Sequence, residues 1–274
     1  MHLRGNWVSD AVTQNRKRLP DSLGFRDGTS SVHTSRTMML TELTLVLEYV
    51  EKNALIDEYL AAIVDQNVLG KPTQTTRKRS AQRLTELYSL DTAHAVFRLL
   101  SYFWSADISA RPMLAFLAAA ARDPLLRDIT PFVVALPANE TLTAAEIASQ
   151  LEEKYPARFK PTTLISTAQN VSSSWTQAGY LSGRLHKKRA HPVVSSVVVT
   201  FALLLGYLCG ARGKMLLDTI WTRMLDRTPA EISDLAMEAS RQGWINFKSA
   251  GSVIDITFPG MLTPQEEKAS NEQN

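Results

Sequence analysis

Apolar side chains recur every three or four positions through the first part of the chain, which is the spacing of helices with one buried face. Gly70 and Pro72 interrupt the pattern. The helical segments are Thr37–Asn53, Ala54–Gln66, Thr75–Leu87 and one that Asp91 or Thr92 can cap and that runs to Trp104. The pattern predicts an all-helical domain over residues 36–110, preceded by a flexible polar tail over residues 1–35.

The next helices carry explicit start signals. Proline occupies the favoured first position of Pro112–Arg122 and Pro124–Leu136, and Thr143–Glu146 is a capping box. A longer helix, Pro161–Gly179, precedes the short basic segment Tyr180–Arg189, whose glycine lies where a hairpin would turn. Two helices joined by a short loop and followed by a hairpin predict a winged helix-turn-helix unit over residues 111–191.

The same order of elements then recurs. Pro192–Gly210 and Gly213–Leu225 have helical patterns, and Thr228–Glu231 combines a cap, a first-position proline and an acid at a helix start. Trp244–Phe247 and Val253–Phe258 alternate on either side of a turn, as hairpin strands do. These signals predict a second winged helix-turn-helix unit over residues 192–262 and a flexible acidic tail over residues 263–274.

The expected fold is therefore mainly α, with an N-terminal helical domain followed by two tandem winged helix-turn-helix units that carry small β-hairpin wings. A single-pass membrane protein is an alternative, because Val193–Ala211 holds 19 residues without a charge and ~20 span a bilayer. A helix surrounded by protein is equally apolar, and we favour that buried helix and no membrane contact. A single cysteine, Cys209, and a polar start without a signal peptide fit the cytoplasm.

Charge is unevenly distributed, although the net charge is only +3. The 64 residues from Lys154 to Leu217 contain nine basic residues and no Asp or Glu, while the remainder holds 21 basic and 27 acidic residues. A solvated basic surface is the simpler explanation. A local excess of cations next to an acidic remainder also favours an anionic partner such as nucleic acid.

The helix that begins at Pro161 has two distinct faces. Leu164, Ala168, Val171 and Trp175 share one face, and small hydrogen-bonding side chains share the other, which suits base edges in a DNA groove. We expect the following residues to face the bases: Thr162, Ser166, Gln169 and Ser173. We expect these residues to contact phosphates: Lys160, Arg184, Lys187, Lys188 and Arg189. A second phosphate-binding surface is expected from Arg77, Lys78, Arg79 and Arg83.

Motifs of catalysis and of cofactor binding are missing from the sequence. The five histidines lack metal-ligand spacing, and Gly70-Lys71-Pro72 and Gly213-Lys214-Met215 lack the other residues of a phosphate loop. We therefore expect no enzyme, no catalytic residue, no metal and no cofactor. The expected partner is double-stranded DNA, and a winged-helix scaffold for protein interactions is the alternative.

Three stretches resemble the small BrxA-type component of bacterial BREX phage-exclusion systems. They are Asn67–Thr73 with Thr76–Arg79 and Arg83-Leu84, then Phe116–Arg122, and then Thr162–Leu181 with its Ala178-Gly179-Tyr180-Leu181 exit. The resemblance implies a cytoplasmic, non-catalytic DNA-binding protein that works with other phage-defence proteins. The oligomeric state is left open by the sequence.

Overall fold

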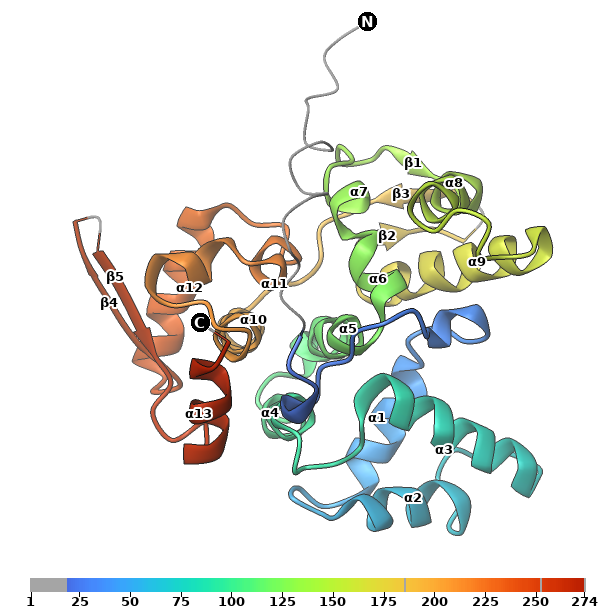
Figure 1. Cartoon of the computed structure of the whole chain (residues 1–274), viewed down its shortest axis with the longest axis horizontal. Helices are drawn as coiled ribbons and strands as arrows, with labels where there is room; N and C mark the ends of the chain where they lie inside the picture. The colour runs from blue at the N-terminus through green and yellow to red at the C-terminus, as the bar shows by residue number, and fades with distance from the viewer. Residues whose placement is uncertain (1–18, 185, 252, 274) are drawn as a thin grey trace, which may run out of the picture.

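The computed structural model describes residues 19–184, 186–251 and 253–273, and it is mainly helical with two small antiparallel sheets (Figure 1). The predicted class, mainly α with small β-hairpins, is confirmed. Residues 1–18 of the predicted N-terminal tail lie outside the described residues.

The chain from residue 19 to residue 39, here called the strap, is not a free tail. It contains two 3₁₀ turns, η1 (Asp21–Leu23) and η2 (Val32–Thr34). Leu23, Phe25 and Val32 are each only 2% exposed. The prediction of a flexible tail is therefore wrong for residues 19–35, because their apolar side chains are part of the core.

Four helices follow the strap, and a central helix packs against most of them. They are α1 (Leu40–Tyr49), α2 (Ile56–Val64), α3 (Gln74–Tyr88), α4 (Ala95–Phe103) and the central α5 (Arg111–Arg122). The predicted cap of α4 is wrong, because the helix begins after His94 while Asp91 accepts from Ala93 N in the preceding turn. Every residue from Met113 to Ala121 is buried, since α5 packs against α3, α4, α9 and α10.

The predicted helix Pro124–Leu136 is two short helices, α6 (Pro124–Asp128) and α7 (Thr130–Val134). The break falls just before Pro131, which has no amide hydrogen to continue the helical bonding. The chain then forms β1 (Thr141–Leu142), α8 (Ala144–Lys154), α9 (Pro161–Gln177), β2 (Leu181–Ser182) and β3 (Lys187–Arg189). The strands form one antiparallel sheet in the order β1-β3-β2, so the last strand lies in the middle.

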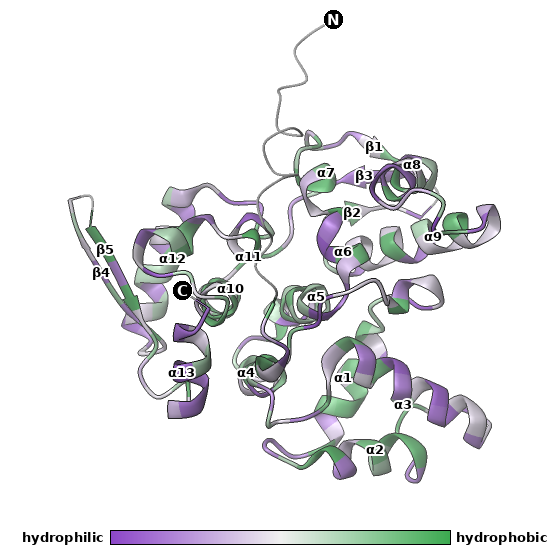
Figure 2. Ribbon diagram, in the orientation of Figure 1, coloured by the Kyte–Doolittle hydropathy of each residue, from purple (hydrophilic) through white to green (hydrophobic). Residues whose placement is uncertain are grey.

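The apolar segment after β3 forms α10 (Ser196–Leu208), in which all but one residue is buried. It packs against α4, α5, α11, α12 and α13, and Figure 2 shows hydrophobic residues concentrated in α5 and α10. The prediction that this segment is a core helix is confirmed. None of the helices in the described ranges has the length and apolar character that crossing a membrane requires.

The C-terminal part differs from its prediction in two places. The expected helix Gly213–Leu225 is a 3₁₀ segment, η4 (Gly213–Asp218), and a short α11 (Ile220–Arg223), because Thr219 adopts an extended backbone and caps α11. The predicted helix and hairpin are present as α12 (Pro229–Arg241), β4 (Asn246–Ala250) and β5 (Val253–Thr257).

The predicted C-terminal tail over residues 263–274 is instead helical from Pro264 to Asn271, which is α13. Glu266 on its inner face pairs with Arg98 of α4 at 2.6 Å, and Tyr207 donates to Glu267 at 2.7 Å. Ring contacts such as Phe103–Trp244 at 5.8 Å join the N-terminal and C-terminal helices. The buried apolar residues thus form one continuous core from Leu23 to Met261.

Candidate nucleic-acid interface

Helices α8 and α9 pack closely against each other and are joined by a short loop. The predicted capping box begins α8: Glu146 N donates to Thr143 Oγ1 at 3.3 Å, and Thr143 N donates to Glu146 Oε2 at 2.8 Å. Lys160 is the exposed N-cap residue of α9, and Pro161 is its first helical residue. These local rules fix where the pair begins.

Helix α9 divides into a buried and an exposed face. Ala168, Val171 and Trp175 are 0% exposed, and the Trp175 ring packs against Phe116 and Tyr180 with centroids 4.6 Å away in each case. The four residues predicted to face the bases lie on the other side: Thr162 and Gln169 are exposed, and Ser166 and Ser173 are half-buried. No residue from Pro161 to Gln177 carries a charge. The exposed face is therefore neutral and rich in hydrogen-bonding groups, and it includes Ile165 at 46% exposure.

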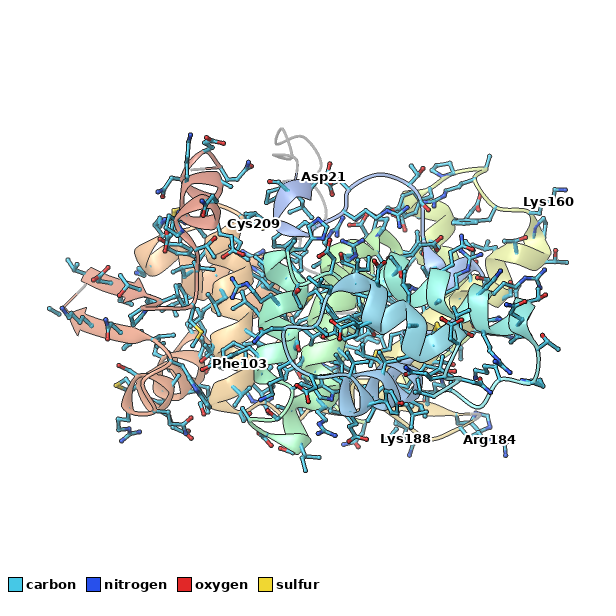
Figure 3. All side chains as sticks on the ribbon, turned by 90° about the horizontal axis from the view of Figure 1, so that it is seen from below. Asp21, Phe103, Lys160, Arg184, Lys188 and Cys209 are labelled. Carbon is cyan, nitrogen blue, oxygen red and sulfur yellow. The ribbon has the colours of Figure 1, made fainter. Side chains whose placement is uncertain are left out.

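The β2–β3 hairpin presents cations beside α9. Its turn needs glycine, because Gly183 has φ +98° and a Cβ there would lie 2.6 Å from His186 O. Arg184 and Lys188 are exposed, while Lys187 is half-buried, and this burial lowers the pKa of its ammonium. In Figure 3, Lys160 lies at one edge of this end of the molecule, and Arg184 and Lys188 lie at the opposite edge.

Arg189 does not belong to this exposed set. It is 2% exposed, since it pairs with Leu181 across the sheet and shares the inner face of β3 with Lys187. Its guanidinium donates to Val133 O at 3.0 Å and pairs with Asp226, in the loop between α11 and α12, at 2.7 Å. The prediction that Arg189 contacts phosphate is wrong, because its charge is already enclosed by protein partners.

The basic residues of α3 separate in the same way. Arg77 donates to Lys71 O at 3.2 Å and to Val64 O at 3.3 Å, so it holds the loop before its own helix. Arg83 pairs with Glu86 at 2.7 Å. Lys78 and Arg79 are exposed, and within the described ranges neither has a hydrogen-bond or ion-pair partner. Only these two of the four predicted residues present an uncommitted charge.

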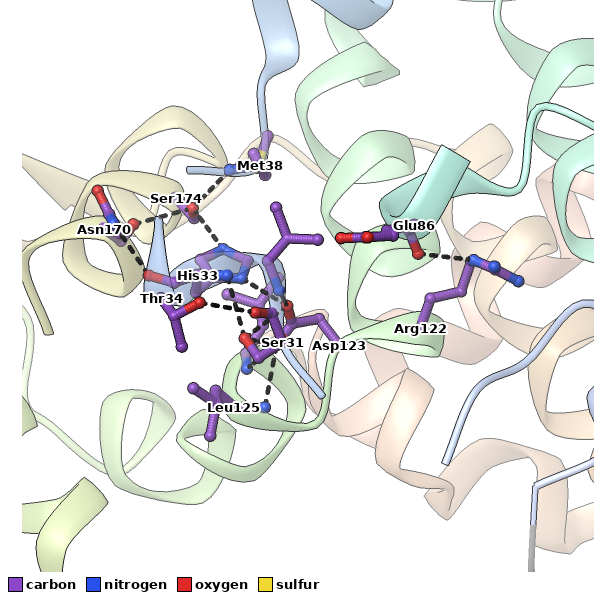
Figure 4. Close-up of polar contacts among 12 residues, drawn as sticks. Ser31, His33, Thr34, Met38, Glu86, Arg122, Asp123, Leu125, Asn170 and Ser174 are labelled. Atoms are coloured by element: carbon purple, nitrogen blue, oxygen red, sulfur yellow. Dashed lines mark hydrogen bonds and ion pairs between the residues drawn. The ribbon is translucent and has the colours of Figure 1, made fainter. Parts of the chain in front are cut away.

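A buried polar network that the sequence prediction missed holds α9 from behind (Figure 4). His33 of the strap lies 2.9 Å from Asp123 through Nδ1 and 2.8 Å from Ser174 of α9 through Nε2. Asn170 Nδ2 donates to His33 O at 2.9 Å, and Leu40 N donates to Gln177 Oε1 at 3.3 Å. The polar stripe formed by positions 170, 174 and 177 therefore binds the strap.

Asp123 is the centre of that network. Burial would raise the pKa of its carboxyl, but the charge and hydrogen bond of His33, together with bonds from Ser31 and Leu126, lower the pKa below its ordinary value. The order Asp123–His33–Ser174 has the spacing of a catalytic triad. However, Ser174 is 0% exposed, and its hydroxyl already accepts from Met38 N and donates to Asn170 O. The arrangement fixes α9 and leaves no room for a substrate at the serine.

A comparison with protein families matches residues 30–201 to the BrxA family, which is more than half of the chain. The chain belongs to the BrxA family. The resemblance stated from the sequence is thereby confirmed. A search of curated proteins found no match.

The BrxA match includes the His33 network, α3, α8, α9 and the β2–β3 hairpin, and it ends within α10. The C-terminal helices and the β4–β5 hairpin lie beyond it. There, the outer face of α12 carries the exposed acids Glu231 and Asp234 and the half-buried Glu238. This face is acidic, in contrast to the neutral face of α9.

Proposed function

We propose that this BrxA-family protein is a non-enzymatic, double-stranded DNA-binding component of a bacterial phage-defence system of the BREX type. The observation that carries the proposal is the uncharged, hydrogen-bonding exposed face of α9, which has Lys160 at one edge and Arg184 and Lys188 at the other. Direct base reading needs donors and acceptors on a helix that enters the groove, and cations at its borders hold the phosphates.

The strand order supports a winged helix-turn-helix for this unit. In such a unit a hairpin follows the second helix, and its last strand pairs with a short strand that precedes the two helices. The order β1-β3-β2 around α8 and α9 has this form, with Lys188 on the outer face of the hairpin opposite Thr141 and Ser182. The hairpin would be the wing and α9 the helix that enters the major groove.

The two other candidate surfaces contribute unequally. Lys78 and Arg79 of α3 would add phosphate contacts from the N-terminal helices. The second predicted winged unit, α11 and α12 with the β4–β5 hairpin, would contribute none, because Glu231 and Asp234 would repel phosphates. DNA binding thus rests on the part of the chain that the family match includes.

A salt titration tests the role of the hairpin cations. Arg184→Ala with Lys188→Ala removes two phosphate contacts, so the dependence of log affinity on log salt should become shallower by about 1.8, at ~0.9 per contact. Fluorescence anisotropy with labelled duplex DNA measures both slopes. Lys248→Ala with Lys268→Ala is the matched control, since these exposed lysines lie on the C-terminal unit and should leave the slope unchanged. An equal slope for all three proteins would remove the hairpin from the DNA interface and favour a protein-interaction scaffold.

A second pair of substitutions tests base reading by α9. Ser166→Ala with Gln169→Ala removes hydrogen-bonding groups without removing charge, so the salt slope should stay and any sequence preference should weaken by ~1–3 kcal/mol per lost base contact. A preferred sequence is first selected from random duplexes with the wild-type protein. Because the exposed face packs against nothing, the melting temperature should be unchanged and serves as the control.

A further inference from the structure

A shallow groove lies between α1 and the loop that joins α2 to α3. It has a volume of about 320 Å³ and is lined by Leu45, Glu48 and Tyr49 of α1 and by Gln66 and Val68 of the loop. Leu45 is 40% exposed and Tyr49 is 58% exposed. Two large apolar side chains on one helix face, beside a partly exposed valine, form a surface that gains free energy when it is covered.

The loop side of this groove is preformed. Val68 N donates to Ala62 O at 3.1 Å, and Lys71 N donates to Asn67 Oδ1 at 2.8 Å. The Lys71 ammonium then pairs with Glu42 of α1 at 3.1 Å, which ties the loop to the opposite wall. A ligand would therefore bind without first having to order the loop, and this saves the entropy of doing so.

The helix side is also fixed. Glu48 pairs with Arg111 of α5 at 2.6 Å, and the Arg111 guanidinium lies over the Trp104 ring at 5.4 Å. The Glu48 side chain nevertheless remains 51% exposed, so it can accept a further cation. Tyrosine beside leucine on a rigid surface is the composition of a protein-binding hot spot.

Charge identifies the chemistry of the occupant. Residues 40–66 contain one basic residue, Lys52, and six acids, which are Glu42, Glu48, Glu51, Asp57, Glu58 and Asp65. Glu48 lines the groove, Asp65 directly precedes a lining residue, and Glu51 follows Tyr49 by two positions. This rim repels phosphate and attracts cations, so the groove suits a cationic protein segment and excludes DNA.

We propose that this groove binds a basic amphipathic helix of a partner protein, with apolar side chains on Leu45, Tyr49 and Val68 and Lys or Arg side chains on the acidic rim. Helix-in-groove recognition uses this combination of an apolar stripe and flanking charge. In Figure 1, α1 and α2 lie at the lower edge of the molecule, away from the β2–β3 hairpin at the top. The groove and the DNA interface can thus be occupied together, and the inference stands independently of DNA binding.

The test uses a fluorescein-labelled helical peptide of about 18 residues, with leucine along one face and lysine elsewhere. Anisotropy measures its affinity for the full chain. Leu45→Ala with Tyr49→Ala should weaken binding by about tenfold or more, since the apolar contact is lost. Leu55→Ala is the matched control, because this leucine is 69% exposed but lies outside the groove, and its affinity should stay within about twofold of wild type.

A second pair of variants tests the rim. Glu51→Gln with Asp65→Asn should weaken binding and reduce its salt dependence, while the exposed acids elsewhere, changed as Asp234→Asn with Glu272→Gln, should not. This arm also decides the matter if the double alanine variant does not fold. The proposal is overturned if a scrambled peptide of equal composition binds as tightly, or if both groove variants bind like wild type. It is equally overturned if the groove variants dissociate an oligomer, which would make a second copy the occupant, or if they abolish DNA binding.

Discussion

The guanidinium of Arg189 has exchanged water for a set of protein partners. It pairs with Asp226, donates to Val133 O and lies 5.3 Å from the Tyr180 ring centroid. Asp226 in turn lies 2.6 Å from the exposed His191 ring. A buried charge with such partners is stable as a set, but each member is costly to leave alone. This residue therefore joins the β2–β3 hairpin to the loop between α11 and α12.

Replacing Arg189 should destabilise the whole molecule. Arg189→Met keeps the volume but leaves Asp226 without its guanidinium, so the free energy of unfolding should fall by about 3 kcal/mol. Urea unfolding followed by circular dichroism measures the loss. Lys188→Met, one position earlier and exposed, should change it by at most about 0.5 kcal/mol. Equal losses for the two variants would contradict the structure.

The carboxylate of Asp123 should make stability depend on pH in the acid range. Its pKa is lower in the folded chain than the ordinary value of about 3.9, so the folded state binds fewer protons than the unfolded state there. The stabilisation is therefore complete above about pH 4 and is lost as the pH falls towards the folded pKa. Asp123→Asn should be less stable than wild type at neutral pH, and the gap should narrow below about pH 4. Urea midpoints measured between neutral and acid pH test this, and a gap that is constant with pH would contradict it.

Among the elements, the helix starts could be predicted from sequence because their causes are local. Thr143 and Thr228 cap α8 and α12 as expected, and Thr263-Pro264 with Glu266 repeats the Thr228-Pro229 and Glu231 pattern. That repeat was the available signal for α13. The burial of His33 and Arg189 could not be predicted in this way, because it depends on partners 90 and 37 residues away in the chain. The candidate α9 face was accessible to prediction, while the choice among its flanking cations was not.

Helix α3 should show this difference within one turn. Lys78→Ala with Arg79→Ala should reduce the salt slope of duplex binding by up to about 1.8 with little effect on stability, since both side chains are exposed. Arg77→Ala should lower the melting temperature, because the loop carbonyls of Val64 and Lys71 lose their donor. Salt titrations and thermal melting of the two proteins give the comparison. A destabilised double variant or an unaffected Arg77 variant would assign these roles wrongly.

The molecule as a whole has no detachable C-terminal end. Glu266 of α13 is 7% exposed and pairs with Arg98 of α4, while Arg212 donates to Ser270 and Asn271 at 2.7 and 2.8 Å. The part of the chain outside the family match is thus fastened to the helices inside it. The acidic groove, the neutral α9 face and the acidic α12 face therefore keep fixed positions relative to one another.

Removing the Glu266 carboxylate should reveal this fastening. Glu266→Ala leaves Arg98 without its charge partner in a mostly enclosed site, so the free energy of unfolding should fall by about 2–3 kcal/mol. The exposed Glu272→Ala, six positions later on the same segment, is the matched control and should cost at most about 0.5 kcal/mol. Chemical unfolding of both proteins measures the difference, and a flexible tail would give none.

The His33–Ser174 hydrogen bond also sets an order of events during synthesis. Its two residues are 141 positions apart, and at ribosomal rates of about 5–20 residues per second the second is made roughly 7–28 s after the first. Until then Asp123, the other partner of His33, can be in place, but α9 cannot. The strap is therefore the first described segment to leave the ribosome and among the last to reach its final contacts. Nascent chains halted before residue 174 would expose the strap to a protease that finished molecules resist.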